Sequence, residues 1–366
     1  MFAKELLKKL LPSEWRQQAR EWFAAMNIVH VYGPRSIQCS NEEAVVTCVV
    51  KNGAFYIESF IKHYSEMGFR HIFFLDNGSS DQTLSIARSY GNVSICQSTL
   101  PISSHQRLFK KYLAERLVRT GWCLDADIDE FFDYPLSNIV GLQAFLAYLN
   151  LYDYTAATTQ LLDMFSDRPI SHLTNEQNED VKSAYQYYDL SDIAKTDYCT
   201  SPVVTKYGYA NKLADRQTPL YWGGIRKTLY GNDCLLTKHS LFLLGGEIKL
   251  FPHVHFVNNA SVADISGVML HYKLTSNAMA IALQNRNNFT ENYRTYDAFI
   301  DVLERESTRE IRRDTAQKFV SATNLAKCKF LLMSAAYEEY AMAMKMSKQS
   351  ECISTYGRSE WPASRT

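Results

Sequence analysis

Residues 122–132 read W-C-L-D-A-D-I-D-E-F-F: apolar residues lead into Asp125, Asp127, Asp129 and Glu130, and two phenylalanines follow. In an extended segment side chains alternate between faces, so we expect the three aspartates to point the same way. Like charges on one face repel unless a cation or a proton compensates them. Hard oxygen ligands suit Mg²⁺, Mn²⁺ or Ca²⁺, so the stretch predicts a divalent-metal site at a strand end. The alternative is a polar strand end with capping aspartates.

The segments before this stretch alternate between strand and helix patterns. Residues 44–50 form a continuous β-branched run, typical of a buried parallel strand, and residues 54–67 carry apolar side chains at helical spacing. Further strands are expected at 71–75, 93–96 and 122–126, and further helices at 83–90 and 105–120. This order predicts a doubly wound α/β domain with a mainly parallel sheet flanked by helices.

Polar turns follow the strands expected at 44–50, 71–75 and 122–126, so all of them fall at carboxyl ends of strands. Ligands of such sheets bind at that edge, and we therefore expect one site there. The turn D-N-G-S-S-D begins with Asp76, and an aspartate at a strand end can hold a ribose or a base N–H. The same residues are also the ordinary composition of turns.

A second glycine-containing stretch, Y-W-G-G-I-R-K-T, covers residues 221–228. The pair Gly223 and Gly224 allows close backbone approach to a ligand, and Arg226 with Lys227 could hold phosphate oxygens. A plain turn is the alternative. His271 lies central in an apolar strand pattern, where it is either a core residue or a ligand completing a carboxylate-bound metal site.

The rest of the chain gives coarser expectations. A helix is expected at 139–150, and strands at 235–244, 249–257 and 268–274. Residues 163–219 look irregular and polar, as in a functional loop region or lid. Helices at 276–293 and 297–346 predict a helical C-terminal extension, followed by a frayed tail at 347–366.

Composition excludes some classes of protein. The 366 residues are 46% hydrophobic and carry a formal net charge of zero, which gives no electrostatic case for nucleic-acid binding. The eight cysteines lack a CxxC pair, which favours free thiols in a reducing compartment. No stretch is apolar enough to span a membrane, and charges interrupt residues 2–11, unlike a secretory signal. We expect a cytoplasmic location.

Residues 2–27 read as one amphipathic helix, or as two helices divided at Pro12, with lysines between the leucines. Such a basic amphipathic segment either packs on its own domain or lies on a membrane surface. We expect packing on the domain, with peripheral contact at the inner face of the membrane as the alternative.

Several stretches together resemble the family-2-type glycosyltransferases with the GT-A fold. They are V-V-K-N-G-A-F-Y-I-E-S-F-I-K-H-Y at 49–64, D-N-G-S-S-D-Q-T at 76–83, the acidic stretch at 122–132, G-G-I-R-K-T at 223–228, L-L-T-K-H-S-L at 235–241 and G-V-M-L-H-Y-K-L at 267–274. More narrowly, the chain resembles the branch whose acidic motif runs D-x-D-E-F, once catalogued as a domain of unknown function. The resemblance covers about residues 44–275 and depends on the order and spacing of the motifs.

This resemblance implies a hexosyltransferase of polysaccharide biosynthesis that uses a nucleotide sugar, usually a UDP-sugar, with Mn²⁺ or Mg²⁺. By position, Asp127 and Asp129 match the DxD pair that holds the metal and the donor phosphates, and His271 matches a completing ligand. Asp76 matches the aspartate at the base or ribose, and Asn52 lies in the loop lining the nucleotide. An extra Asp125 allows the pair to be read as Asp125 and Asp127, but Glu130-Phe131 then no longer follows it.

The family inverts the anomeric carbon, so the acceptor hydroxyl must give its proton to a base. Family members place an aspartate or glutamate for this in the second half of the domain. Glu247, Asp233 and Asp215 are candidates here, and Glu247 is preferred because it follows Gly245-Gly246. The implied acceptor is a glycan or a lipid-linked glycan.

The expected organisation is an N-terminal helical segment and linker at 1–43, a GT-A-like domain at 44–275, helices at 276–346 and the tail. Within the domain, 44–135 form the nucleotide-binding half and 136–275 the acceptor half. Two other functions remain open: a nucleotidyl- or phosphotransferase with an aspartate-bound Mg²⁺, and a non-catalytic nucleotide-sugar-binding protein. The chain has no Walker-type phosphate loop.

Overall fold

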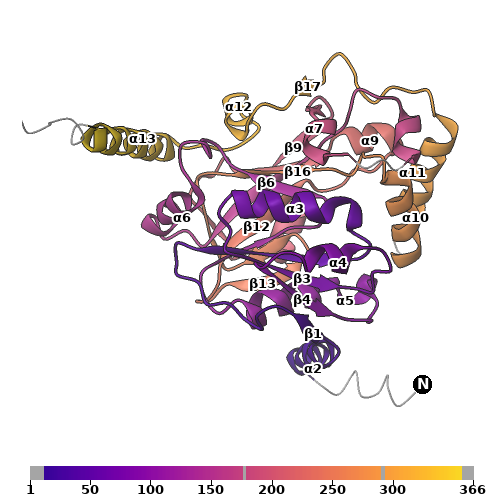
Figure 1. The fold of residues 1–366 in the computed structure, drawn as a ribbon, viewed down its shortest axis with the longest axis horizontal. Coiled ribbons are helices and arrows are strands. Elements are labelled where there is room, and N and C mark those ends of the chain that lie inside the picture. The colour runs from indigo at the N-terminus through magenta and orange to yellow at the C-terminus, as the bar shows by residue number, and fades with distance from the viewer. Residues whose placement is uncertain (1–11, 176–178, 290–292, 357–366) are drawn as a thin grey trace, which may run out of the picture.

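A computed structural model describes residues 12–175, 179–289 and 293–356 (Figure 1). Eleven strands of the described residues form one central sheet. They are β1 (Val29–Tyr32), β2 (Ala44–Val50), β3 (His71–Asp76), β4 (Val93–Gln97), β5 (Trp122–Asp125), β6 (Glu130–Asp133), β7 (Ala156–Asp163), β10 (Lys212–Leu213), β12 (Thr237–Leu243), β15 (Ser261–Val262) and β16 (Gly267–His271).

Three small two-stranded sheets and a set of helices complete the described fold. The small sheets pair β8 (Tyr187–Tyr188) with β17 (Gln317–Lys318), β9 (Ile193–Asp197) with β11 (Pro219–Gly223), and β13 (Lys249–His253) with β14 (Phe256–Asn258). The α-helices are α2 (Ser13–Met26), α3 (Ala54–Glu66), α4 (Thr83–Ala87), α5 (Ile102–Tyr112), α6 (Leu142–Leu151), α7 (Val181–Ala184), α8 (Pro202–Tyr207), α9 (Ile225–Tyr230), α10 (Ala278–Asn288), α11 (Tyr293–Arg305), α12 (Ala322–Lys327) and α13 (Ala335–Tyr356).

The central sheet is mixed, with more parallel than antiparallel pairings. Its order is β1-β4-β3-β2-β5-β12-β7-β15-β10, and β16 adds to β7 and to β6. Strands β4, β3, β2 and β5 pair in parallel. Because β12 runs antiparallel to both β5 and β7, β7 points the same way as β5, and β16 lies parallel to β7. The expected α/β class is confirmed, with helices flanking a sheet that is less uniformly parallel than expected (Figure 1).

The burial of β2 on both faces explains why its sequence is almost entirely apolar. Every residue of β2 is buried. Val46, Cys48 and Val50 join the hydrophobic core that contains α3, and Val45 and Val49 join the core that contains α5. Since helices cover both faces of the strand, its sequence does not alternate between polar and apolar residues. The elements expected between residues 44 and 126 are found with shifts of up to three residues at their ends, because a π-helical turn, Leu113–Leu117, continues α5.

The described residues correct the expected N- and C-terminal organisation. The segment at 1–43 is more than a helix and linker, because β1 pairs antiparallel with β4 as an edge strand of the central sheet. Helix α2 begins directly after Pro12, and residues 1–11 lie outside the described part. The expected tail at 347–366 is helical as far as Tyr356, where α13 ends, and the remaining residues are not described.

The segment at 163–219 was expected to be irregular, as in a functional loop region or lid, and the expected irregularity is wrong. It contains short helices and strands, including the two-residue β8 and the six-residue α8. Tyr185, Tyr188 and Tyr198 from this segment are buried. Elements this short show no readable periodicity, so the sequence pattern suggested loop where the chain is packed.

Two further expectations need correction. The strand expected at 249–257 is a hairpin of β13 and β14, in which His253 pairs with Phe256. The single helix expected at 297–346 is divided into α11, α12 and α13.

Cys39, Cys48, Cys96 and Cys123 are buried free thiols, as expected. Within the described residues, no helix has both the length and the hydrophobicity to cross a bilayer.

Candidate functional site

Polar side chains from distant parts of the chain gather at one edge of the central sheet. Strands β2, β3, β5, β7 and β16 all point toward this edge. Asp76, Asp125, Asp163 and His271 are the last residues of their strands. Strand β12 starts at the same edge and brings Lys238 there as its second residue. The prediction that polar residues meet at the carboxyl edge is confirmed for Asp76 and Asp125.

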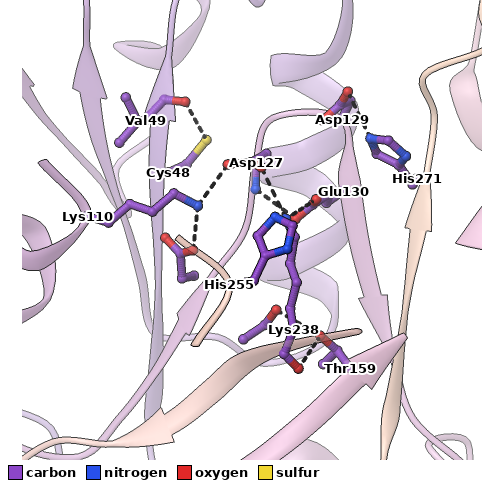
Figure 2. Close-up of polar contacts among 12 residues, drawn as sticks. Cys48, Val49, Lys110, Asp127, Asp129, Glu130, Thr159, Lys238, His255 and His271 are labelled. Atoms are coloured by element: carbon purple, nitrogen blue, oxygen red, sulfur yellow. Dashed lines mark hydrogen bonds and ion pairs between the residues drawn. The ribbon is translucent and has the colours of Figure 1, made fainter. Parts of the chain in front are cut away.

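The acidic stretch leaves the extended conformation directly after Asp125. A turn follows, in which the Glu130 N–H donates to the Asp127 carbonyl at 3.0 Å. The Asp127 N–H in turn donates to Glu130 Oε2 at 3.1 Å. The expectation that the three aspartates share one face is therefore wrong: Asp125 and Asp127 share Lys110 as a partner, whereas Asp129 lies beside His271. Figure 2 shows Asp127 and Asp129 with these different partners.

Two buried lysines compensate the first part of the acidic cluster. Lys110 of α5 lies 2.7 Å from Asp125 Oδ2 and 3.1 Å from Asp127 Oδ1. Lys238 lies 3.2 Å from Asp127 Oδ2 and also binds Glu130. The two lysine side chains are only 1% and 4% exposed. Each oxygen of the Asp127 carboxylate thus faces one ammonium group, as Figure 2 shows.

The electrostatics of this cluster follow from burial and the lysines. Burial raises the pKa of Asp125 to about 6, although Lys110 opposes the shift. Burial acts in the same direction on Asp127, but Lys110 and Lys238 outweigh it and hold the pKa of Asp127 well below its usual range. Burial disfavours the charged form of Lys110, yet the carboxylates raise its pKa. The lysines therefore stay protonated, and Asp127 stays ionised.

The second part of the site is a chain of four residues centred on His271. The His271 Nδ1 donates to Asp163 Oδ1 at 2.5 Å, and its Nε2 lies 3.4 Å from Asp129 Oδ2. Arg226 Nε donates to the other oxygen of Asp163 at 2.8 Å. Burial alone would lower the pKa of His271, but Asp129 and Asp163 outweigh it and raise that pKa.

The pair of Asp129 and His271 is suited to hold a cation. Because Asp163 accepts from Nδ1, the Nε2 lone pair of neutral His271 faces the Asp129 carboxylate, and a proton or a metal ion must lie between them. Two ligands of one octahedral ion lie about 3 Å apart, close to the observed separation of 3.4 Å. Asp127 is instead bound to lysines, and no three potential ligands among the described residues form a metal-holding group.

Asn52 and Asp76 lie at the same edge and bind one turn. Asn52 has a positive φ of 51°, and its Oδ1 accepts from the Ser80 N–H at 2.8 Å. Asp76 is buried and accepts from the Ser79 N–H and from Gln97, each at 3.0 Å. Both side chains hold the D-N-G-S-S-D turn in place, and their contact with a nucleotide stays a prediction.

The glycine pair connects β11 to α9. Gly223 and Gly224 have φ values of 86° and 74°, which favour glycine, and the turn brings Arg226 beneath Asp163. Arg226 is buried, and its Nη2 has no hydrogen-bond partner among the described residues. Lys227 points elsewhere and pairs with Asp233 at 2.9 Å on the surface.

The candidates for the catalytic base lie in different places. Glu247 is exposed and follows the far end of β12, where Leu243 pairs with Trp122, the first residue of β5. Glu247 therefore lies at the opposite edge of the sheet, and its choice as base is wrong on geometry. Asp215 caps its own turn by accepting from the Gln217 N–H. Asp233, near α9, stays a prediction.

Sequence reasoning missed Lys110, Lys238 and Asp163 as members of the site. Asp163 ends the buried strand β7 in the same way as Asp76 and Asp125 end theirs, but Thr158, Thr159 and Gln160 make that strand read as partly polar in the sequence. Lys110 lies three and seven residues before Leu113 and Leu117, on the apolar side of its helix. Lysines on an apolar face are rarely buried without a partner.

Comparison with known proteins gives no family: no protein-family model matches the chain, and no curated protein matches it significantly.

Proposed function

We propose that this protein is an inverting glycosyltransferase of the GT-A type, which transfers a sugar from a nucleotide sugar, in the first place a UDP-sugar, to a glycan or lipid-linked glycan. One observation carries the proposal. A pair that can hold a cation, Asp129 and His271, is joined through Asp163 to Arg226, whose Nη2 lacks a partner. A metal-bound diphosphate requires both a cation site and a donor for phosphate oxygens.

The anion-binding side of the site supports this reading. A buried guanidinium N–H without a partner is costly, and a phosphate oxygen would satisfy it. Lys273 adds a second positive charge, since it interacts electrostatically with both Asp129 and Arg226. Positive charge on one side and carboxylates on the other match a nucleotide diphosphate with its Mn²⁺ or Mg²⁺.

The chain's own residues have distinct roles in the proposed reaction. Asp129 and His271 would hold the ion, which when bound would neutralise charge on the leaving diphosphate. Asp163 fixes the orientation of the His271 ring through Nδ1. Asp127 is the member of the acidic cluster that a substrate reaches first, because its side chain is 34% exposed. Asp233, which is half-exposed and pairs with Lys227, is the remaining candidate base for the acceptor hydroxyl, and this role stays a prediction.

The test is nucleotide release and Mn²⁺ binding across UDP-, GDP- and CMP-sugars, with Asp129→Asn and His271→Gln as the site variants. We expect release of UDP from one donor, a loss of at least about tenfold in metal affinity, and a corresponding loss of turnover in both variants. Glu247→Gln is the matched control, an exposed carboxylate at the other edge of the sheet.

Other outcomes would select other functions. Release of phosphate or pyrophosphate without sugar transfer would indicate a phospho- or nucleotidyltransferase. Tight binding of a nucleotide sugar without turnover would indicate a binding protein. If Glu247→Gln abolishes turnover and Asp129→Asn does not, the assignment of the site is wrong.

A further inference from the structure

Helix α2 presents an apolar face to solvent. Trp15, Ala19, Trp22 and Met26 recur at spacings of three and four residues, so they form one stripe along the helix. The two tryptophans and Met26 are 64%, 66% and 61% exposed. Helix α2 does pack on the domain, as expected, but this stripe is not the face that packs; the leucines at 6–11 on which the expectation rested lie outside the described residues.

The opposite side of α2 attaches it to the rest of the protein. Ala24 is buried, and Glu21 binds Lys111 of α5 at 2.8 Å. Helix α2 lies beyond the β1 edge of the sheet, at the bottom of Figure 1. The docked side is thus small and partly polar, whereas the large apolar side chains point away. This orientation leaves the stripe available to a partner.

A basic groove of about 1160 Å³ adjoins α2, between that helix, α5 and β13. Five basic side chains line it: Arg16, Arg20, Arg107, Lys111 and Lys249. Its two acidic residues, Glu21 and Glu115, both pair with Lys111. Among the described residues, Arg16, Arg20 and Lys249 have no acidic partner within ion-pair distance. Since the whole chain has zero net charge, this surface is a local concentration of positive charge.

The sequence preceding α2 has the same character. Residues 2–11 read F-A-K-E-L-L-K-K-L-L, with three lysines and one glutamate among apolar residues. Apolar residues and lysines are therefore also the composition of the sequence directly before the described helix.

We propose that the stripe on α2 and the adjoining basic groove dock on the surface of an anionic lipid bilayer. Tryptophan is suited to the boundary between headgroups and acyl chains, because its ring is apolar and its N–H is polar. Arginine side chains can extend from the helix to lipid phosphates while their stems stay in apolar surroundings. Residues of both kinds lie together here, and that combination fits a membrane surface.

A second copy of the chain fits this surface less well. A symmetric dimer through α2 would place Arg16 and Arg20 of each copy near the same basic groove of the other. Such juxtaposed like charges oppose association. An anionic surface is complementary to the whole patch, which favours lipid over self-association.

The experiment is co-sedimentation of the full chain with two kinds of vesicle: phosphatidylcholine alone, and phosphatidylcholine mixed with phosphatidylglycerol. We expect binding only to the anionic vesicles, weakened by salt, with a blue shift of tryptophan emission. Trp15→Ala with Trp22→Ala should reduce partitioning by at least about tenfold. Arg16→Gln and Arg20→Gln should each reduce it about fivefold.

Two controls distinguish binding through this surface from nonspecific hydrophobic adsorption and from the proposed catalysis. Leu151→Ala removes a large side chain of similar exposure, 66%, on another surface and should leave binding unchanged. The α2 variants should keep their circular dichroism spectrum and should release nucleotide from a soluble donor at the wild-type rate. Membrane binding and sugar transfer can then fail independently of each other.

Three results would overturn the proposal. The first is equal binding to neutral and anionic vesicles. The second is binding that depends on residues 2–11 and is unchanged in every α2 variant. The third is a vesicle-free dimer, seen by sedimentation velocity, that the Trp15→Ala and Trp22→Ala changes abolish, because the stripe would then bind a second copy.

Discussion

Two adjacent lysines of α5 show how burial determines the strength of an ion pair. Lys110 is buried against Asp125 and Asp127, whereas Lys111 forms partly exposed pairs with Glu21 and Glu115. We predict that Lys110→Met lowers the free energy of unfolding by about 3–5 kcal/mol, since it leaves buried carboxylates uncompensated. Lys111→Met should cost less than about 1 kcal/mol. Urea unfolding of both variants measures the difference.

A second substitution distinguishes the stability lost with the ion pair from the stability lost with side-chain packing. In Lys110→Met, adding Asp125→Asn removes the uncompensated carboxylate, so part of the stability should return. Equal stability of the Lys110→Met and Lys111→Met variants would contradict the buried ion-pair network.

Histidines buried in neutral form make the fold sensitive to acid. Burial, assisted by Lys182, lowers the pKa of His63 to about 4, and burial lowers that of His239 to about 4. The unfolded chain binds protons near about pH 6.5, so stability is full above that pH and falls as the pH approaches 4. Each histidine should account for a loss of about 2 kcal/mol between about pH 7 and about pH 5.

Urea unfolding at several pH values tests this dependence. His63→Gln should make the decline less steep by the contribution of one histidine. Gln106→Ala, at a partly exposed, non-titrating position of α5, is the control and should leave the slope unchanged. An unaltered slope in His63→Gln would show that other groups cause the acid sensitivity.

The site could be predicted from sequence only where its signal was local. Asp125, Asp127 and Asp129 lie within five residues of one another, so their charge was visible as a motif. Their partners Lys110 and Lys238 lie 15 and 108 residues away from Asp125 and Glu130, respectively. Only the arrangement of α5 and β12 in the fold brings these charges together. The turn after Asp125 likewise depends on hydrogen bonds that the pattern did not indicate.

At the scale of elements, long periodic segments were predictable and short ones were not. The buried strand β2 and the amphipathic α3 have clear patterns, and both were found. The break between α11 and α13 was missed, although Ser321 is a readable signal there. Its side chain accepts from the Asn324 N–H and caps the start of α12. Tertiary contacts decided the segment at 163–219, where each element is too short for a pattern.

The pairing of β6 with β16 depends on a glycine. A Cβ at Gly267 would lie 2.4 Å from the Phe132 ring and 3.0 Å from the Asp133 carbonyl. We predict that Gly267→Ala destabilises the protein by about 1–3 kcal/mol, because the closely packed ring must move. Strand β16 ends at His271, so a displaced strand should also weaken Mn²⁺ binding.

Gly91→Ala is the matched control for this prediction. No atom lies within 4 Å of a Cβ at Gly91, so its thermal unfolding temperature should stay close to that of the wild type. If Gly267→Ala is as stable as Gly91→Ala, then β6 and β16 are less closely packed than described.

At the scale of the molecule, the two edges of the central sheet carry different residues. The carboxyl edge carries the polar cluster, and the antiparallel β12 takes the chain from Lys238 there to the opposite edge near Glu247. Direction along the sheet, more than distance along the sequence, decides which residues can act together. A candidate base nine residues from Lys238 is for this reason not part of the site.

Helix α13 projects from the body of the molecule (Figure 1), and its first turns are anchored there. Tyr337 and Ala341 are buried, and the Tyr337 hydroxyl donates to the Pro135 carbonyl at 2.9 Å. The side chains of Met342 and Met346 are exposed. The anchored turns should therefore contribute most of the stability that α13 gives to the domain.

We predict that a chain ending after Ser347 unfolds at nearly the wild-type urea concentration, because the anchored turns remain. A chain ending after Ser334 should lose several kcal/mol, since removing the buried Tyr337 leaves an aromatic cavity beside Phe145 and Tyr148. Tyr337→Ala in the full chain distinguishes that cavity from loss of the helix, and should account for most of the effect. Equal stability of the two truncated chains would mean that α13 is not anchored through Tyr337.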